Sequence, residues 1–286
     1  MRFPDVDIEI DFILINKKTL MSYLWILLAV SLAVCSMGWR FIVYFFSIGY
    51  GYGIAALAIA SAVIFHNQLT PSTIACCIVL FIFGCRLGTY LLLRERKAKG
   101  YRQILEDSKQ RRPGFGESFV VWISCALLYV AQISPLAFRL GNSAEGGTVN
   151  ELWAWIGAAV MLAGTLLEAI ADAQKTKAKK VAPQRFVDTG LYRFVRCPNY
   201  LGEVTIWTGC LLLNIGIAAT AWQWVISAIG YIGIIYVMFS GARRLEIRQE
   251  NTYGEDPEYR AYVKRTPILI PFLPIYSVMK YKWLVA

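Results

Sequence analysis

The chain has 286 residues, 57% of them hydrophobic, and a formal net charge of +10. Because soluble domains average about 45–50% apolar residues, this composition excludes an ordinary soluble globular protein. The apolar residues form blocks that can cross a hydrocarbon core, which takes about 20 residues per helix. Lys and Arg gather between these blocks, as is typical of membrane topology signals, so we expect no nucleic-acid partner despite the basic charge.

Hydropathy predicts an all-α, polytopic integral membrane protein with about seven transmembrane helices in a single membrane domain, residues 1–286. In chain order the predicted spans are Leu20–Trp39, Phe41–Phe65, Ser72–Leu93, Phe119–Phe138, Leu152–Ala173, Tyr200–Ala218 and Trp222–Ser240. Alternating glycines in the second span, Gly49, Gly51 and Gly53, indicate close packing against another helix.

The charge of the connections predicts the orientation of these spans. Arg94–Pro113, Gln174–Asn199 and the tail after Ser240 are rich in Lys and Arg. The opposite connections carry one formal charge among them, on Glu145; they are His66–Pro71, Gly141–Asn150 and Gly216–Ala221. The positive-inside rule therefore puts the N-terminus outside and the C-terminus in the cytoplasm, in a bacterial inner membrane or the endoplasmic reticulum.

Two acids lie near the end of the fifth predicted span. Glu168 and Asp172 are four residues apart, so they share one helix face. Ionisable side chains at membrane depth are costly and usually face a cavity. The alternative is that Asp172 reaches water and pairs with Lys175.

The start of the sixth span favours an anion. Pro198 suits the first turn of a helix, whose free N–H groups attract anions. Arg193 and Arg196 flank this turn, and arginine is suited to phosphate. Glu203 then lies one turn inside the membrane, followed by Trp207 one turn further on the same face. A basic loop with aromatic anchors is the alternative interpretation.

The tail offers two tyrosines on one helix face, Tyr259 and Tyr262. Their hydroxyls can contact a nucleotide, or the two rings are interfacial aromatics. The following run Arg265–Pro274 is amphipathic and limited by prolines, which favours a cap lying on the membrane face.

The cysteines and the histidine of this chain give little indication of a catalytic or metal-binding role. Six of the seven cysteines lie in apolar blocks, where thiols act as small packing residues. No Cys/His cluster occurs and His66 is the single histidine, so we expect no metal site and no Ser-His-Asp triad. Cys197 lies beside Arg196, which could lower the pKa of its thiol.

These motifs resemble the steroid 5-alpha-reductase family, in its broad bacterial and eukaryotic form. The resemblance is strongest over Gly157–Pro274 and weaker over Phe46–Arg102. The features that carry it are Glu168-x-x-x-Asp172-x-Gln174, Gly190-Leu191-Tyr192-Arg193, Arg196-Cys197-Pro198-Asn199-Tyr200-x-Gly202-Glu203, Trp207, Tyr259-x-x-Tyr262 and Arg86-Leu87-Gly88-x-Tyr90-Leu91.

The resemblance implies a membrane reductase that binds NADPH from the cytoplasm and delivers hydride to the conjugated C=C bond of a lipophilic enone, steroid-like or another lipid. It implies that residues 1–150 hold the substrate cavity and residues 151–286 the nucleotide-binding region, in a monomer surrounded by membrane lipid. The implied cofactor-binding residues are Glu168, Asp172, Tyr192, Arg193, Arg196, Asn199, Trp207, Arg244, Tyr259 and Tyr262.

Two positions depart from the family pattern. Cys197 stands where the family usually has histidine. Members that reduce steroids place a glutamate in span two to hold the carbonyl oxygen, and Phe41–Phe65 has no acidic residue. The remaining candidates for catalytic residues are Tyr44, Tyr50, Tyr90 and Glu203.

Two other functions stay open. A membrane methyltransferase that uses S-adenosylmethionine, of the isoprenylcysteine or phospholipid type, shares the Arg196-x-Pro198-x-Tyr200 pattern and allows the Glu246…Tyr259 tail. Asp172 and the lysines of Lys175–Lys180 favour a dinucleotide with phosphate groups instead. The third possibility is a membrane protein that binds lipid without catalysis.

Overall fold

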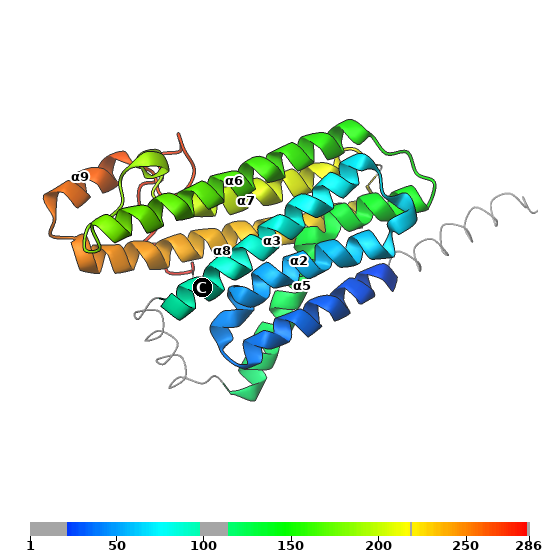
Figure 1. The fold of residues 1–286 in the computed structure, drawn as a ribbon, viewed down its shortest axis with the longest axis horizontal. Helices are drawn as coiled ribbons and strands as arrows, with labels where there is room; N and C mark the ends of the chain where they lie inside the picture. The colour runs from blue at the N-terminus through cyan, green and yellow to red at the C-terminus, as the bar shows by residue number, and fades with distance from the viewer. Residues whose placement is uncertain (1–21, 98–113, 218, 285–286) are drawn as a thin grey trace, which may run out of the picture. The chain divides into compact units, whose positions relative to one another are not determined.

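The computed structural model describes residues 22–97, 114–217 and 219–284 (Figure 1). The described elements are helices, apart from one isolated antiparallel β-bridge between Val149 and Ile217. Among the described residues, five helices are long and apolar enough to cross a membrane; they are Ser22–Trp39, Pro71–Arg94, Phe115–Ala144, Glu151–Val181 and Ala221–Tyr253. The protein is therefore an all-α, polytopic integral membrane protein, as its composition predicts.

The second and sixth predicted spans form shorter helices. Helix α2, Ile48–Ile64, has 17 residues and follows the 3-10 helix η2, Ile42–Phe46. Helix α7, Pro198–Leu211, has 14 residues and passes into the 3-10 helix η5, Leu212–Asn214. The apolar stretches are therefore longer than the α-helices they contain, because one turn of each adopts 3-10 geometry.

Two helices extend beyond the apolar blocks that predict them. Helix α6 covers Glu151–Val181, so the first part of the expected loop Gln174–Asn199 is helical. Helix α8 covers Ala221–Tyr253 and continues well past Ser240. Hydropathy detects the membrane-spanning part only, whereas Ala, Gln, Glu, Lys and Arg sustain a helix in water.

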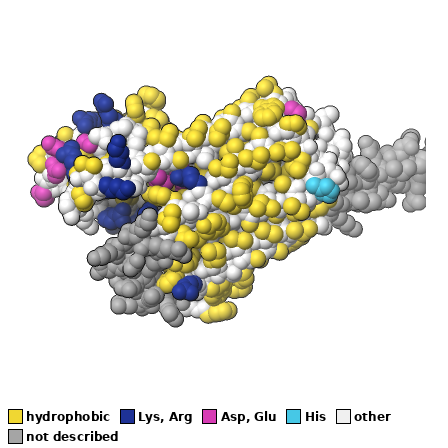
Figure 2. Space-filling view, viewed as in Figure 1, with side chains coloured by type: hydrophobic (Ala, Val, Ile, Leu, Met, Phe, Trp, Pro, Cys, Tyr) yellow, Lys and Arg dark blue, Asp and Glu magenta, His cyan; other side chains and the backbone are white. Residues whose placement is uncertain are grey.

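The chain divides into two compact units. Unit 1 comprises Met1–Ala158 and Cys210–Gly230, and unit 2 comprises Ala159–Gly209 and Tyr231–Ala286. Figure 2 shows hydrophobic side chains over the long helices and Lys and Arg side chains gathered near the end of unit 2 that carries α9, Pro257–Arg265.

In unit 1, glycines bring α2 against α3, Pro71–Lys97. A Cβ atom on Gly51 would lie 2.6 Å from the backbone nitrogen of Gly88, and one on Gly84 would lie 2.5 Å from the Gly51 carbonyl oxygen. The two backbones are therefore in contact, which side chains would prevent. This confirms the packing role expected for Gly51.

Three connections of unit 1 meet at an ion pair of a buried arginine and a partly exposed glutamate. Arg139, near the end of α5 (Phe115–Ala144), is 1% exposed and donates to Glu151 at 3.2 Å and to the Asn150 carbonyl oxygen at 2.8 Å. The second Glu151 oxygen accepts hydrogen bonds from the Thr70 and Ser72 hydroxyls. Asn150 also donates its backbone N–H to the carbonyl oxygen of Gly216. The weakly charged connections of the sequence therefore lie together.

In unit 2, α7 packs closely on α6 because Gly202 has no side chain. A Cβ atom there would lie 2.8 Å from the Glu168 Cβ atom and from the Gly164 carbonyl oxygen. Helix α9 begins with Asp256 as its N-cap, which accepts a hydrogen bond from the Glu258 backbone N–H at 2.8 Å, and Pro257 occupies the first turn.

Candidate functional site

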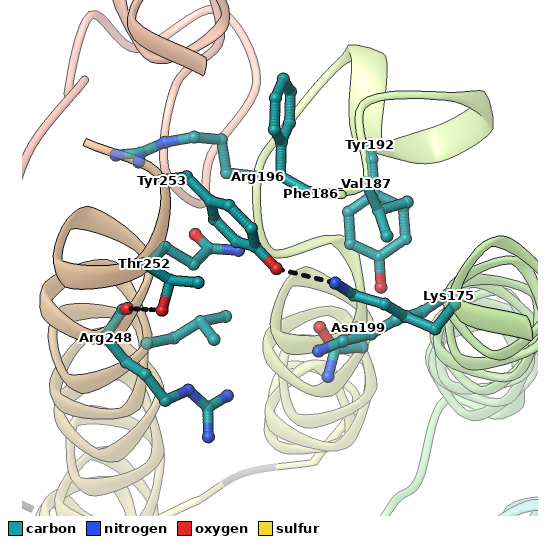
Figure 3. A pocket seen from close by; sticks show the side chains of 12 residues that line it. Lys175, Phe186, Val187, Tyr192, Arg196, Asn199, Arg248, Thr252 and Tyr253 are labelled. Atoms are coloured by element: carbon teal, nitrogen blue, oxygen red, sulfur yellow. Dashed lines mark hydrogen bonds between the residues drawn. The ribbon is translucent and has the colours of Figure 1, made fainter. Parts of the chain in front are cut away.

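A pocket of about 240 Å³ lies in unit 2 among α6, the connection 182–197, the start of α7 and the end of α8. Figure 3 shows its side chains converging from these elements. The lining residues are Lys175, Lys179, Phe186, Val187, Tyr192, Arg196, Asn199, Leu245, Arg248, Gln249, Thr252 and Tyr253.

The lining is basic. Lys175, Lys179, Arg196 and Arg248 contribute cations, whereas none of the lining residues is an Asp or Glu. Asn199 adds an amide from the first turn of α7, where helix N–H groups favour negative charge. A pocket with this lining favours an anionic ligand.

Lys179 joins the walls of the pocket. Its ammonium group donates to the Tyr253 hydroxyl at 2.9 Å and to the carbonyl oxygens of Pro183 and Arg185 at 3.1 and 2.6 Å. A dashed line marks this hydrogen bond at the Tyr253 hydroxyl in Figure 3. An ammonium group has three N–H donors, and all three of Lys179 form hydrogen bonds. They hold the connection 182–197 and α8 to α6.

Arg196 pairs with α8. Its Nη2 atom donates to Glu246 at 2.7 Å and to the Tyr276 carbonyl oxygen, and both side chains of the ion pair are 1% exposed. The other Glu246 oxygen accepts the backbone N–H of Val278 at 2.8 Å. The Arg196 Nε and Nη1 atoms are buried and make no hydrogen bond to any described residue. The pair thus connects the pocket wall to the tail.

The tail tyrosines lie behind the pocket. Tyr262 donates its hydroxyl to the Tyr192 carbonyl oxygen at 2.7 Å, and Tyr192 donates to the Ala171 carbonyl oxygen at 3.3 Å. Tyr259 and Tyr262 pack with Phe186 in an aromatic cluster. Burial raises the pKa of Tyr259 to about 12, outweighing the nearby Arg196. Tyr259 is therefore neutral at physiological pH, and Tyr262 acts as a hydrogen-bond donor.

The thiol of Cys197 is not activated. Burial raises its pKa to about 12, and this effect exceeds the lowering by Arg196. The expectation of a lowered pKa is therefore wrong, although Arg196 acts in that direction, because Cys197 is 1% exposed and the carboxylate of Glu246 lies close by. A catalytic thiolate at this position has no support.

The structure places the predicted cofactor-binding residues in different surroundings. Tyr192, Arg196 and Asn199 line the pocket. The predicted cofactor-binding residues that are buried in unit 2 but lie outside this lining are Glu168, Asp172, Trp207, Tyr259 and Tyr262, and the same holds for Glu203, which was predicted as catalytic. Asp172 is 5% exposed and so does not reach water. Arg193 and Arg244 are exposed and also lie outside the lining.

The tyrosines predicted as catalytic belong to unit 1. Tyr44 is buried and packs in a cluster with Ile48, to which Leu91 of α3 also belongs. Tyr50 is buried, with its ring 5.0 Å from that of Tyr129. Tyr90 is half-buried, and its ring lies under the Arg94 guanidinium. All three remain predictions as hydroxyl donors.

Sequence reasoning missed the α8 side of the pocket. Leu245, Arg248, Gln249 and Thr252 repeat at helical spacing and therefore share one face. The predicted seventh span ends at Ser240, so these four residues fell outside it and their helical spacing was not recognised. Extending the helix through the charged residues to Tyr253 would have grouped them.

Comparisons with known proteins place the chain in a family. A sequence model of the family described as "Protein of unknown function (DUF1295)" matches residues 45–266, which include every residue lining the pocket. "Uncharacterized protein C594.04c" of Schizosaccharomyces pombe is 27% identical over 167 residues, 51% of this chain and 46% of that protein. The match thus spans about half the length of this curated relative. No solved structure matches the chain.

Proposed function

We propose that this chain, which belongs to the family described as "Protein of unknown function (DUF1295)", is an integral membrane reductase dependent on NADPH. In this proposal the pocket of unit 2 binds the cofactor. Bound NADPH supplies a hydride, and the acceptor is the conjugated C=C bond of a lipophilic enone. The resemblance of Glu168–Glu203 and the tail to the steroid 5-alpha-reductase family supports this reaction class.

The observation that carries the proposal is the charge of the pocket. Lys175 and Arg248 bring positive charge to a lining without carboxylates, beside the amide of Asn199. NADPH bears phosphate groups, for which arginine and lysine are the usual partners. S-adenosylmethionine bears a sulfonium cation, so the same lining disfavours the methyltransferase alternative.

The size of the pocket supports binding of only one part of the cofactor. Pockets for drug-sized ligands measure about 300–1,000 Å³, whereas this one has about 240 Å³. It therefore suits the phosphate-bearing end of the nucleotide. The nicotinamide ring then needs a separate place, for which the buried Glu203 and Trp207 of α7 are the candidates in unit 2.

The orientation follows from the same charges. In the proposed topology of seven spans, the pocket faces the cytoplasm, where NADPH is available, because the basic ends of α6 and α8 lie on the positive side. The hydroxyls of Tyr44, Tyr50 and Tyr90 are the proposed partners of the substrate carbonyl oxygen. The proposed substrate enters from the lipid.

NADPH titration of the purified protein tests the proposal. We expect saturable binding that weakens about tenfold in Lys175→Gln and in Arg248→Gln. Lys177→Gln is the matched control, because Lys177 lies on the same helix but is exposed and outside the lining. Absence of saturable binding, or equal effects of Lys175→Gln and Lys177→Gln, would overturn it. Thermal protection by S-adenosylmethionine but not by NADPH would favour the methyltransferase.

A further inference from the structure

The segment 276–284 runs along α8 and is held mainly through its backbone. Val278 donates its N–H to Glu246, and the carbonyl oxygens of Met279 and Leu284 accept hydrogen bonds from Arg243 at 3.1 and 3.4 Å. The hydroxyl of Tyr236 donates to the Trp283 carbonyl oxygen at 3.0 Å. The contacts therefore leave most side chains of the segment exposed.

The segment stays against one stretch of α8, between Tyr236 and Glu246. As it proceeds from Val278 to Trp283, its partners on α8 change from Glu246 to Tyr236. These partners are ten residues apart, or about 15 Å at a rise of 1.5 Å per residue. Leu284 then returns to Arg243, so the segment stays beside this part of the helix instead of leaving it.

The lower end of the segment reaches the membrane-spanning part of α8. Residues 221–242 contain no charged side chain, and Tyr236 lies inside this stretch of a candidate span. Arg243 is the first charged residue after it, seven residues beyond Tyr236. The Trp283 carbonyl oxygen therefore contacts the uncharged stretch, while the neighbouring Leu284 carbonyl oxygen contacts Arg243 at its edge.

The side chains of the segment suit the boundary between headgroups and acyl chains. Trp283 is 65% exposed while its ring stacks on Tyr236, with centroids 6.2 Å apart. Tyr281 is also exposed, and Lys280 and Lys282 alternate with these aromatic residues. Trp and Tyr concentrate at membrane interfaces, and Lys extends its ammonium group from there to water.

Many polar backbone groups of segment 276–284 are paired, as suits a medium of low polarity. Irregular backbone is costly in lipid unless its polar groups are paired. Arg243 and Tyr236 satisfy three carbonyl groups, and turns within the segment pair the N–H groups of Tyr281, Lys282 and Leu284. An exposed aqueous strand would not require these pairings.

We propose that segment 276–284 is an interfacial segment that binds the lipid bilayer at the boundary of headgroups and acyl chains, with Arg243 holding it against α8. This proposal does not depend on the reductase assignment. It gives the tail a defined partner, the bilayer, and a defined position beside one helix.

Site-specific fluorescence in nanodiscs tests this placement. In a Cys85→Ser background, where the remaining described cysteines are buried, a bimane label is placed at Trp283→Cys, or at Lys282→Cys with Trp283 intact. We expect both labels to be quenched by shallow nitroxide lipids and shielded from aqueous iodide. A label at Lys264→Cys on α9 should show the opposite pattern. Iodide quenching at 282 and 283 equal to that at 264 overturns the proposal.

The role of Arg243 has its own comparison. Arg243→Gln should shift the label at 282 from lipid quenching to iodide quenching, because two carbonyl partners of the segment are weakened. Arg248→Gln, which removes the same charge from the pocket face of the helix, should leave the label unchanged. Persistent lipid quenching in Arg243→Gln overturns the assignment of Arg243 as the holding residue.

Discussion

The ammonium group of Lys179 on α6 lies 2.9 Å from the hydroxyl of Tyr253 on α8. The same lysine donates to two carbonyl groups of the connection that follows α6. One side chain therefore joins three walls of the pocket. Its role in unit 2 is architectural, although its charge also contributes to the field inside the pocket.

Replacing Lys179 should loosen the pocket more than replacing Tyr253. Lys179→Met keeps the apolar stem but removes three hydrogen bonds, and we expect it to destabilise unit 2 by about 1–2 kcal/mol, given the half-exposed position. Tyr253→Phe keeps the ring and removes one bond, for about 0.5–1 kcal/mol. Thermal unfolding in detergent measures both. Equal losses would show that the carbonyl contacts contribute nothing.

The Arg196–Glu246 pair should be strongly coupled. Breaking one partner of a buried ion pair costs about 3–5 kcal/mol, because the other charge remains buried. We therefore expect Glu246→Gln and Arg196→Met each to lower the unfolding temperature sharply. The double variant should lose less than the sum of the two. An additive result would mean that the two side chains act independently.

Adding a methyl group at Gly202 should separate α6 from α7. Its Cβ atom would meet the Glu168 and Gly164 backbones at 2.8 Å, and overpacking costs about 1–3 kcal/mol. Gly116→Ala is the matched control, because nothing lies within 4 Å of a Cβ atom there and Gly116 is also helical. We expect the temperature of thermal unfolding to be lowered only by Gly202→Ala. Similar curves for both variants would contradict the close packing.

Cys197 should resist alkylation and contribute to alkaline sensitivity. Its pKa is raised from 9.0 to about 12 by burial, so the folded state favours the neutral thiol. The associated stability is present below pH 9 and is lost as the pH rises toward 12. Peptide mapping after iodoacetamide treatment at pH 8 should find Cys197 unmodified until the protein unfolds. Cys197→Ala should lose less stability than the parent between pH 9 and 11.

The fold was largely predictable because hydropathy reports burial in lipid directly. The apolar blocks located the long helices, and Pro198 marked the start of α7. The positions of the helix ends were harder to predict from the sequence. Lys175–Lys180 and Arg243–Arg248 are polar residues with good helix propensity, and an apolar count stops before them.

The site was predictable only in part, because it depends on contacts between distant segments. Tyr192, Arg196 and Asn199 lie within one short motif, and this local grouping was visible in the sequence. The partnership of Arg196 with Glu246 joins residues 50 positions apart, and no single segment shows it. Burial likewise reversed the expectation for Cys197, since neighbours in sequence do not report desolvation.

The ion pair of Arg139 and Glu151 has a consequence for biogenesis. Its surroundings include Thr70 and, through Asn150, the turn at Gly216. The ribosome makes Thr70 long before Gly216, so the common end of the helices of unit 1 cannot close until the later segment has been made. A nascent chain arrested before that turn would hold an incompletely enclosed arginine, a state that membrane quality control could distinguish from the finished protein.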